Sequence, residues 1–169
     1  MKTIYLTGFM GSGKSAAGWI AANLLNVPCF DLDAVIEKNA GKTIKELFEQ
    51  EGEASFRLRE SVLLQKMPKE NCVVITGGGL PADQNNREYM MGVGHVVYLK
   101  TSFKEIMKRL TAPGEIDKRP VLKEKTAEEI ELLYNKRKSF YEECSMVIAT
   151  DGKTPQQVAE EMVKAFCLN

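Results

Sequence analysis

The sequence has 169 residues, of which 44% are apolar and 27% charged, a balance typical of one globular domain with one hydrophobic core. Lysine plus arginine and aspartate plus glutamate each total 23, so the formal net charge is zero. A neutral chain has no overall field that would favour nucleic acid or an anionic membrane, and we expect neither partner. Any affinity for phosphate must come from basic groups placed locally.

The cysteine, histidine and N-terminal patterns exclude further classes of protein. The four cysteines form no C-x-x-C pair and stand at Cys29, Cys72, Cys144 and Cys167. His95 is the only histidine, so a zinc site is not expected. The N-terminus has no long apolar segment of the kind found in signal peptides, and no stretch resembles a membrane helix. We therefore expect a cytoplasmic protein, and a monomer.

Short β-branched runs alternate with stretches of helical spacing along the chain. In chain order the pattern predicts a strand at 2–7, a helix at 14–25, a strand at 27–30, a helix at 33–40, a helical turn opened by a Thr43–Glu46 capping box, a helix at 53–67, strands at 72–76 and 95–99, helices at 102–110 and 128–143, a strand at 145–149 and a helix at 154–166. Such alternation is typical of an α/β fold whose parallel sheet is covered by helices on both faces.

Narrower expectations concern the core, one loop and the domain count. Phe56, Val62 and Leu63 are expected to be core residues of their helix. Residues 111–125 contain two prolines and a glycine among many charges, which predicts an exposed loop long enough to serve as a lid. No internal repeat or linker interrupts the chain, so we expect one domain spanning 1–169.

Residues 8–15, Gly-Phe-Met-Gly-Ser-Gly-Lys-Ser, match the phosphate-binding pattern G-x-x-x-x-G-K-[ST] in full. Glycines let the main chain curl so that its N–H groups converge on phosphate oxygens, and the following helix adds a favourable dipole. Lys14 can reach the β- and γ-phosphates, and the Ser15 hydroxyl is a suitable Mg²⁺ ligand. A plain glycine turn would need neither the Gly-Lys-Ser ending nor the position after the first strand. The motif therefore predicts nucleotide binding but says little about the second substrate.

Two aspartates, Asp31 and Asp33, follow the second predicted strand. Ligands collect at the carboxyl ends of strands in a parallel sheet, so both side chains are expected near the phosphate cradle. One carboxylate would serve Mg²⁺ through water, and the other would meet an acceptor hydroxyl. The alternative is that Asp33 is only a helix N-cap.

Arginines and glycines further along the chain are candidates for an acceptor site. Arg57 and Glu60 share a helix face, and a solvated ion pair is the simpler interpretation of that spacing. The glycines at 77–79 end a strand at the ligand edge, where they would allow a ligand to approach the main chain. Arg119 stands in the predicted lid. Arg137 lies in a run of three bases, which is usually a solvated face, although the guanidinium of arginine suits a carboxylate or phosphate.

Four blocks occur in a fixed order: GFMGSGKS at 8–15, FDLD at 30–33, FRLRE at 56–60 with TGGG at 76–79, and RPVL at 119–122 followed by NKRKSFYEE at 135–143. Through these blocks the chain resembles the shikimate kinase family over essentially its full length. The resemblance implies a nucleoside-monophosphate-kinase-like fold with a five-stranded parallel sheet, an acceptor-binding region at about 31–61 and a mobile lid at about 111–125. It also implies ATP- and Mg²⁺-dependent phosphorylation of shikimate to shikimate 3-phosphate, in aromatic amino acid biosynthesis.

On the nucleotide side, the resemblance implies that Lys14 contacts the transferred phosphate and that Arg119 stabilises it when the lid closes. Ser15 and Asp31 would serve Mg²⁺. Arg109 is similar to the family's adenine-stacking arginine. The expected ATP-binding residues are Gly11, Ser12, Gly13, Lys14, Ser15, Ala16, Arg109, Arg119, Lys153 and Pro155, the last two from an adenine loop.

On the acceptor side, the resemblance implies that Asp33 binds the shikimate hydroxyls and helps to deprotonate the one that attacks. Arg57, Arg137 and the main chain of Gly78 and Gly79 would hold the carboxylate side. The expected catalytic residues are Lys14, Asp33 and Arg119.

Two other classes of function remain open on the residues alone. Another kinase of the same fold, acting on gluconate or a nucleoside monophosphate, would also use arginines to hold an anionic acceptor. A P-loop module that binds ATP without catalysis is a second alternative, although such a module would be expected to have lost Lys14, Asp33 or Arg119.

Overall fold

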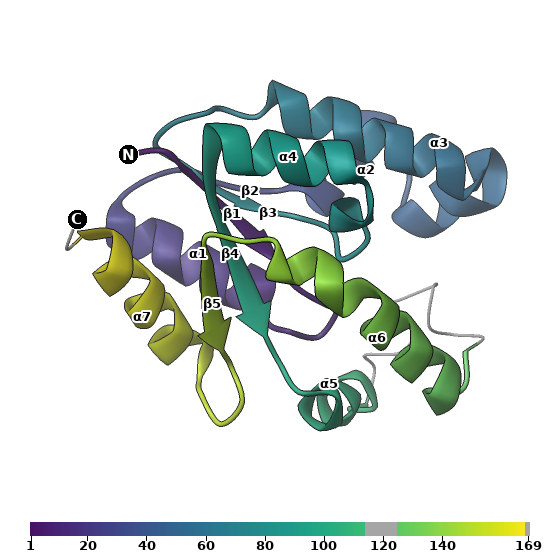
Figure 1. Ribbon diagram of the computed structural model, residues 1–169. Helices are drawn as coiled ribbons and strands as arrows, with labels where there is room; N and C mark the ends of the chain where they lie inside the picture. The colour runs from purple at the N-terminus through teal and green to yellow at the C-terminus, as the bar shows by residue number, and fades with distance from the viewer. Residues whose placement is uncertain (114–124, 168–169) are drawn as a thin grey trace.

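The computed structural model describes residues 1–113 and 125–167, and within these ranges the chain forms a five-stranded, all-parallel sheet (Figure 1). The spatial order of the strands is β2-β3-β1-β4-β5. The strands are β1 (Thr3–Thr7), β2 (Cys29–Asp31), β3 (Val73–Ile75), β4 (Gly94–Lys100) and β5 (Met146–Ala149). The chain therefore leaves β1 at the centre, fills one side of the sheet and crosses to the other.

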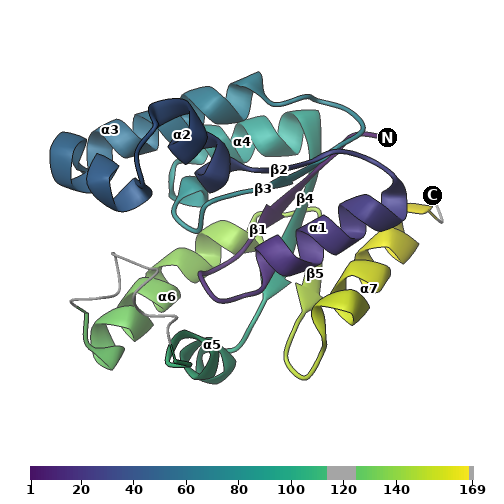
Figure 2. The same ribbon diagram turned by 180° about the vertical axis from the view of Figure 1, so that it is seen from behind.

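Helices cover both faces of this sheet. They are α1 (Lys14–Leu25), α2 (Leu32–Ala40), α3 (Ile44–Lys66), α4 (Gln84–Val93), α5 (Phe103–Leu110), α6 (Ala127–Glu142) and α7 (Pro155–Cys167), with one 3-10 turn, η1 (Leu80–Ala82). Helices α2, α3 and α4 lie on one face, and α1 and α7 lie on the opposite face (Figure 2). Helices α5 and α6 lie toward the end of the sheet where β4 points (Figure 1). The predicted α/β fold with a parallel sheet is confirmed.

The two faces are set by the period-2 alternation of buried strand residues. In β1, Ile4 and Leu6 pack with α1 and α7, whereas Tyr5 between them packs with the side of α2, α3 and α4. All three side chains are fully buried. Burial on both faces explains why the strand is a continuous apolar run in the sequence.

A third apolar cluster joins the phosphate loop to α5 and α6. Its buried members are Phe9, Tyr98, Ile106, Leu110, Ile130, Tyr134 and Tyr141. The rings of Phe9 and Tyr134 meet edge to face, with centroids 5.4 Å apart. This packing places α6 beside the loop that follows β1, although about 120 residues separate them along the chain.

The predicted strands and helices agree with the structure, with ends shifted by one or two residues. The predicted capping box at Thr43 and Glu46 is present, and it opens a helix that continues through a break at Gly52 (φ 79°) to Lys66. Val62 was wrongly expected in the core, because its side chain is 46% exposed, whereas Phe56 and Leu63 are buried as expected.

Sequence analysis missed η1 and α4. Helix α4 reads QNNREYMMGV, in which asparagines and a glycine lower the helix propensity. The Asp83 side chain starts the helix by accepting a hydrogen bond from the Asn85 N–H at 2.8 Å. Its buried side also carries polar residues, Asn86 and Arg87, which hides the apolar periodicity that normally indicates a surface helix.

Among the described residues, no helix is both long and apolar enough to cross a membrane.

Candidate active site

The loop at residues 8–13 joins β1 to α1 and forms a cradle of main-chain groups. Gly8, Gly11 and Gly13 have positive φ angles of 143°, 81° and 89°, which L side chains rarely adopt. A Cβ at Gly8 would also lie 2.8 Å from the carbonyl oxygen of Leu99. The glycines of the motif are therefore required by the curl of the loop.

Lys14 begins α1 and folds back over the cradle. Its Nζ donates hydrogen bonds to the carbonyl oxygens of Gly8 at 2.8 Å and Phe9 at 3.1 Å. The side chain is 9% exposed, so the ammonium group is largely shielded from water. A shielded cation at a helix N-terminus is suited to the terminal phosphates of a nucleotide.

Ser15 and Asp31 bring two kinds of oxygen ligand together beside the cradle. The Ser15 hydroxyl donates a hydrogen bond to Asp31 Oδ2 at 3.0 Å. The other carboxylate oxygen, Oδ1, accepts from the N–H of Asp33 at 3.1 Å and caps α2. The helix cap is therefore Asp31, not Asp33 as the alternative interpretation held. A hydroxyl and a carboxylate side by side next to a phosphate cradle fit Mg²⁺, which prefers oxygen ligands and retains water and phosphate oxygens.

A cavity of about 470 Å³ opens over the cradle. It is lined by Met10, Gly11, Gly13, Lys14, Ser15, Ala16, Asp31, Asp33, Ile75, Thr76, Gly78 and Arg109. The lining comes from the carboxyl ends of the central strands and from the loops that follow them, which is where parallel α/β folds bind ligands. The cavity therefore joins the phosphate loop to the aspartates and the glycine turn.

Asp33 is a largely desolvated carboxyl group on the acceptor side of this cavity. Burial, the largest influence, and the nearby Asp31 raise its pKa to about 6, while Lys14 and Arg57 oppose the shift. A carboxyl with a pKa near the working pH is well suited to accept a proton from a hydroxyl.

Arg57 and Glu60 on α3 form a buried pair behind the glycine turn. The Glu60 side chain is 1% exposed, and its Oε2 accepts from Arg57 Nη1 at 2.5 Å. Burial raises the pKa of Glu60, and the Arg57 guanidinium partly offsets that shift. The guanidinium also contacts the faces of two phenylalanine rings on the same helix. The simple interpretation of this pair as solvent-exposed is thus wrong for Glu60.

Two of the three glycines at 77–79, Gly77 and Gly79, are crowded by charged side chains. A Cβ at Gly77 would collide with Glu60 Oε1 and lie 3.0 Å from Asp33 Oδ1. A Cβ at Gly79 would lie 2.5 Å from the guanidinium of Arg57. Side chains at these two positions would displace Asp33, which lines the cavity, and Glu60 and Arg57, which do not line it but contact the turn, so the turn serves close approach and not chain reversal alone.

Arg137 turns inward from α6, although it lies within three consecutive bases. Its side chain is 8% exposed, whereas Lys136 is exposed. Its Nη1 lies 3.9 Å from where a Gly78 Cβ would be, and it contributes to the electrostatics of Glu60. One turn later, the Tyr141 hydroxyl donates to the Gly78 carbonyl oxygen at 2.6 Å. The last turns of α6 therefore contact the glycine turn directly.

Some of the remaining predicted nucleotide-binding residues line the cavity, and others do not. Arg109 on α5 lines it and donates from Nη1 to the Gly11 carbonyl oxygen at 3.1 Å. Ser12 is buried, and its Oγ has no hydrogen-bond partner within the described residues. Lys153 and Pro155 do not line the cavity; Lys153 pairs with Glu161 and Pro155 begins α7. Arg119 lies outside the described residues.

Two residues that contribute to this arrangement were not assigned a role from the sequence, namely Glu60 and Tyr141. Glu60 was recognised only as an ion-pair partner, because spacing on a helix does not show which face is buried. Tyr141 had no local signal beyond its place in the block NKRKSFYEE. Both depend on contacts between segments far apart in the chain.

The parallel sheet, the phosphate cradle with its lysine, and the facing carboxyl and guanidinium groups together define a P-loop kinase of the nucleoside-monophosphate-kinase type. Deoxyadenosine kinase from M. mycoides shares this fold, with a TM-score of 0.66 at 16% identity over 98% of this chain and 99% of that one.

Closer comparisons identify the family. The family model described as shikimate kinase matches residues 10–167. Shikimate kinases of Persephonella marina and Enterococcus faecalis are 42% and 38% identical, covering 96% and 97% of this chain and 98% of each relative. The solved structure of shikimate kinase from Acinetobacter baumannii in complex with shikimate superposes with a TM-score of 0.92 at 33% identity, covering 100% of this chain and 94% of that one. The chain therefore belongs to the shikimate kinase family.

Proposed function

We propose that the cavity between the phosphate cradle and α6 is where this protein transfers the γ-phosphoryl group of ATP to a ring hydroxyl of shikimate. As a member of its family the protein is a kinase that uses ATP to form shikimate 3-phosphate in aromatic amino acid biosynthesis. One observation carries the assignment of the site. Lys14 and Asp33 line one cavity, and Arg57 and the buried Arg137 lie close to the glycine turn that also lines it.

On the nucleotide side, the main chain of residues 8–13 would hold the phosphates. Lys14 would offset charge on the γ-phosphoryl oxygens while that group moves to the acceptor. Ser15 and Asp31 would hold Mg²⁺ between the phosphate oxygens. Mg²⁺ supplies charge neutralisation and alignment of the phosphates when it is bound. Arg109 lies against the cradle at Gly11, which supports a position beside the nucleotide.

On the acceptor side, Asp33 would accept a hydrogen bond from the attacking hydroxyl and take its proton as the oxygen–phosphorus bond forms. Arg57, Arg137 and the main chain at Gly78 and Gly79 would hold the ring carboxylate. Two guanidinium groups in a shielded site favour a carboxylate through charge-assisted hydrogen bonds. Transfer then depends mainly on alignment of the hydroxyl with the γ-phosphorus.

Arg119 remains a prediction, as does a lid at about 111–125. If Arg119 stabilises the transferring phosphoryl, Arg119→Ala should lower kcat much more than it weakens shikimate binding. Near-normal turnover in that variant would remove Arg119 from the catalytic set.

The direct test is to incubate the protein with MgATP and shikimate and to identify the product by ³¹P NMR. Gluconate and a set of nucleoside monophosphates serve as competing acceptors in the same ADP-release assay. We expect kcat/KM to be highest for shikimate, with the phosphate on the 3-hydroxyl. Faster transfer to another acceptor would reject the proposal. ATP binding without transfer to any acceptor would support a non-catalytic module instead.

The proposed site needs no second subunit, because all of its residues belong to one chain, and we propose that the protein works as a monomer. Sedimentation velocity at assay concentrations tests this point.

Dependence on ATP favours a cytoplasmic location, and Cys29, Cys72 and Cys144 are free thiols, as is usual in a reducing compartment.

A further inference from the structure

We propose that Asn86 and Arg87, two neighbouring residues on α4, are positioning residues for acceptor recognition. In this proposal they fix the turn at 77–82 to α3 on one side and to α6 on the other. The glycine main chain, Arg57 and Arg137 then keep the relative positions needed to hold a carboxylate. The inference rests on the proposed function and adds a role for the helix that sequence analysis missed.

Asn86 connects the turn to α3. Its side chain is 4% exposed, and Nδ2 donates to the Leu80 carbonyl oxygen at 3.2 Å and to Ser61 Oγ at 3.0 Å. The Ser61 hydroxyl in turn donates to the main-chain carbonyl oxygen of Arg57 at 3.1 Å. A continuous chain of hydrogen bonds therefore runs from the turn to the main chain of Arg57.

Arg87 connects the same turn to α6. Its side chain is 9% exposed, and Nη1 donates to the carbonyl oxygens of Pro81 at 2.9 Å and Ala82 at 3.3 Å. Its Nε donates to Glu143 Oε2 at 2.8 Å, and its guanidinium lies 5.0 Å from the centre of the Phe140 ring. Both partners on that side lie at the end of α6, close to Arg137 in the chain.

These bonds matter because the turn begins with three consecutive glycines, and its own main-chain hydrogen bonds, from Leu80 to Gly77 and from Ala82 to Gly79, do not connect it to α3 or α6. Consecutive glycines leave the main chain free to adopt many conformations. The carbonyl groups of Pro81 and Ala82, at the end of η1, accept from Arg87, and the Leu80 carbonyl accepts from Asn86 in addition to the Asp83 N–H. Gly79 approaches the Arg57 guanidinium so closely that a small displacement of the turn would alter the carboxylate contacts.

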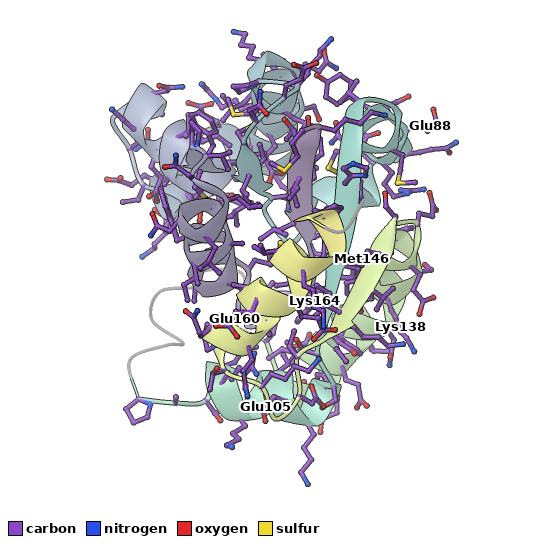
Figure 3. The ribbon with its side chains drawn as sticks, turned by 90° about the vertical axis from the view of Figure 1, so that its left-hand side faces the viewer. Glu88, Glu105, Lys138, Met146, Glu160 and Lys164 are labelled. Carbon is purple, nitrogen blue, oxygen red and sulfur yellow. The ribbon has the colours of Figure 1, made fainter. Side chains whose placement is uncertain are left out.

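The test compares Arg87→Met and Asn86→Leu with the wild-type protein. Asn86→Leu keeps the branched shape of the side chain and Arg87→Met keeps its unbranched stem, and both variants lose the donors. Glu88→Gln is the matched control, because Glu88 is exposed on the same helix and points away from the body of the fold (Figure 3), and within the described residues its side chain bonds only to Gln84. KM and kcat are measured for ATP and for shikimate. The melting temperature and the fraction of active sites are recorded for each protein.

We expect Arg87→Met and Asn86→Leu each to raise the KM for shikimate roughly tenfold, with the KM for ATP unchanged and a smaller effect on kcat. Glu88→Gln should match the wild type. A variant that merely unfolds in part would instead lower the apparent kcat through fewer active sites, with both KM values preserved. That result in both variants would overturn the proposal.

A second measurement isolates the carboxylate. Binding of shikimate is compared with binding of its analogue in which the carboxylate is reduced to a hydroxymethyl group. In the wild type this reduction should cost roughly tenfold or more in affinity. In Arg87→Met the cost should be clearly smaller, because the groups that bind the carboxylate are already misplaced. Equal costs in both proteins would overturn the inference.

Two further outcomes are distinguishable. If Arg87→Met does not fold, Glu143→Ala decides in the same assays, since it removes the acceptor of Arg87 Nε, the Glu143 side chain is 54% exposed, and the bonds from Arg87 to the turn are kept. A selective rise in the KM for shikimate supports the proposal, and unchanged constants overturn it. If the wild type does not phosphorylate shikimate at all, the proposed function fails first; normal wild-type activity with unaffected variants rejects the α4 proposal alone.

Discussion

The nucleotide side and the acceptor side of the cavity are built in different ways. The nucleotide side is a contiguous stretch, residues 8–15, in which positive φ angles shape a main-chain cradle. The proposed acceptor side is assembled from α2 and the turn after β3, which line the cavity, and from α3 and the end of α6, which contact that turn. Glycines serve both sides, but for different reasons. In the cradle they allow the curl of the backbone, and at Gly77 and Gly79 they leave room for side chains of other elements.

The two sides also treat charge differently. Lys14 donates hydrogen bonds to main-chain carbonyl oxygens of the loop that it follows. Asp33, Arg57, Glu60 and Arg137 are charges taken out of water together, and the pKa values of both carboxyl groups are raised by burial. Buried charges without full compensation lower stability, which is common at sites that must bind charged groups. We therefore expect substitutions to affect turnover and stability in different ways mainly on the acceptor side.

The largest effect is expected at Lys14. Lys14→Met should lower kcat by roughly 10²- to 10³-fold, because it removes a shielded cation from the transferring phosphoryl group. Thermal unfolding should change little, since the methionine stem preserves the packing. Lys14→Arg, which keeps the charge with a different shape, is the control. A Lys14→Met protein with unchanged kcat would show that the cradle works without its cation.

Asp33→Asn should come next, with kcat reduced by roughly 10²-fold or more through loss of the proton acceptor. The same variant should be more stable at neutral pH, by on the order of 1–2 kcal/mol, because it removes a carboxylate ionised against a desolvation penalty. Turnover assays and denaturant unfolding measure the two quantities. Lower stability together with near-normal kcat would contradict the expectation that this substitution lowers turnover and raises stability.

Gly79→Ala should act on acceptor binding alone. Gly79 has an ordinary φ of −93°, so an alanine causes no backbone strain there, but its Cβ would displace the Arg57 guanidinium. We expect the KM for shikimate to rise roughly tenfold while the KM for ATP stays constant.

Gly92→Ala is the matched control for this substitution. Nothing lies within 4 Å of a Cβ at that position of α4, so it should leave both KM values unaltered. A rise in the KM for ATP in Gly79→Ala would show that the two sides of the cavity are not independent.

The smallest effect is a dependence on pH. Since the pKa of Asp33 is raised to about 6, kcat/KM for shikimate should increase with pH and level off above that value. Stability should move the other way. The folded chain holds this proton more tightly than the unfolded chain, so the free energy of unfolding should fall as pH rises from about 4 through about 6.

Asp33→Asn should reduce the dependence of the free energy of unfolding on pH. Glu60→Gln should reduce it as well, because burial also raises the pKa of Glu60. Unfolding curves measured at several pH values decide the point. A slope that is the same in all three proteins would place the titrating groups elsewhere.

The sequence could predict the sheet and most helices because strand runs, capping boxes and helical spacing are local signals. Helix α4 was not predicted, because its buried face carries Asn86 and Arg87 at positions where apolar residues would indicate a helix. Val62 was misplaced for the reverse reason, because an apolar side chain at helical spacing does not have to be buried. Helix α3 was predicted in two pieces, as one turn through Phe48 and a helix at 53–67, because the non-helical Gly52 divides its pattern.

The phosphate cradle was determined by the sequence itself, because its geometry arises from neighbouring residues whose backbone angles only glycine readily adopts. Tertiary structure alone decided that Arg137 turns inward while Lys136 stays in solvent, that Glu60 is buried behind the glycine turn, and that α4 holds that turn in place. These features depend on which surfaces meet when distant segments pack. Local spacing carries no record of that choice, since a charged residue on a helix looks the same in the sequence whether its face meets water or another helix.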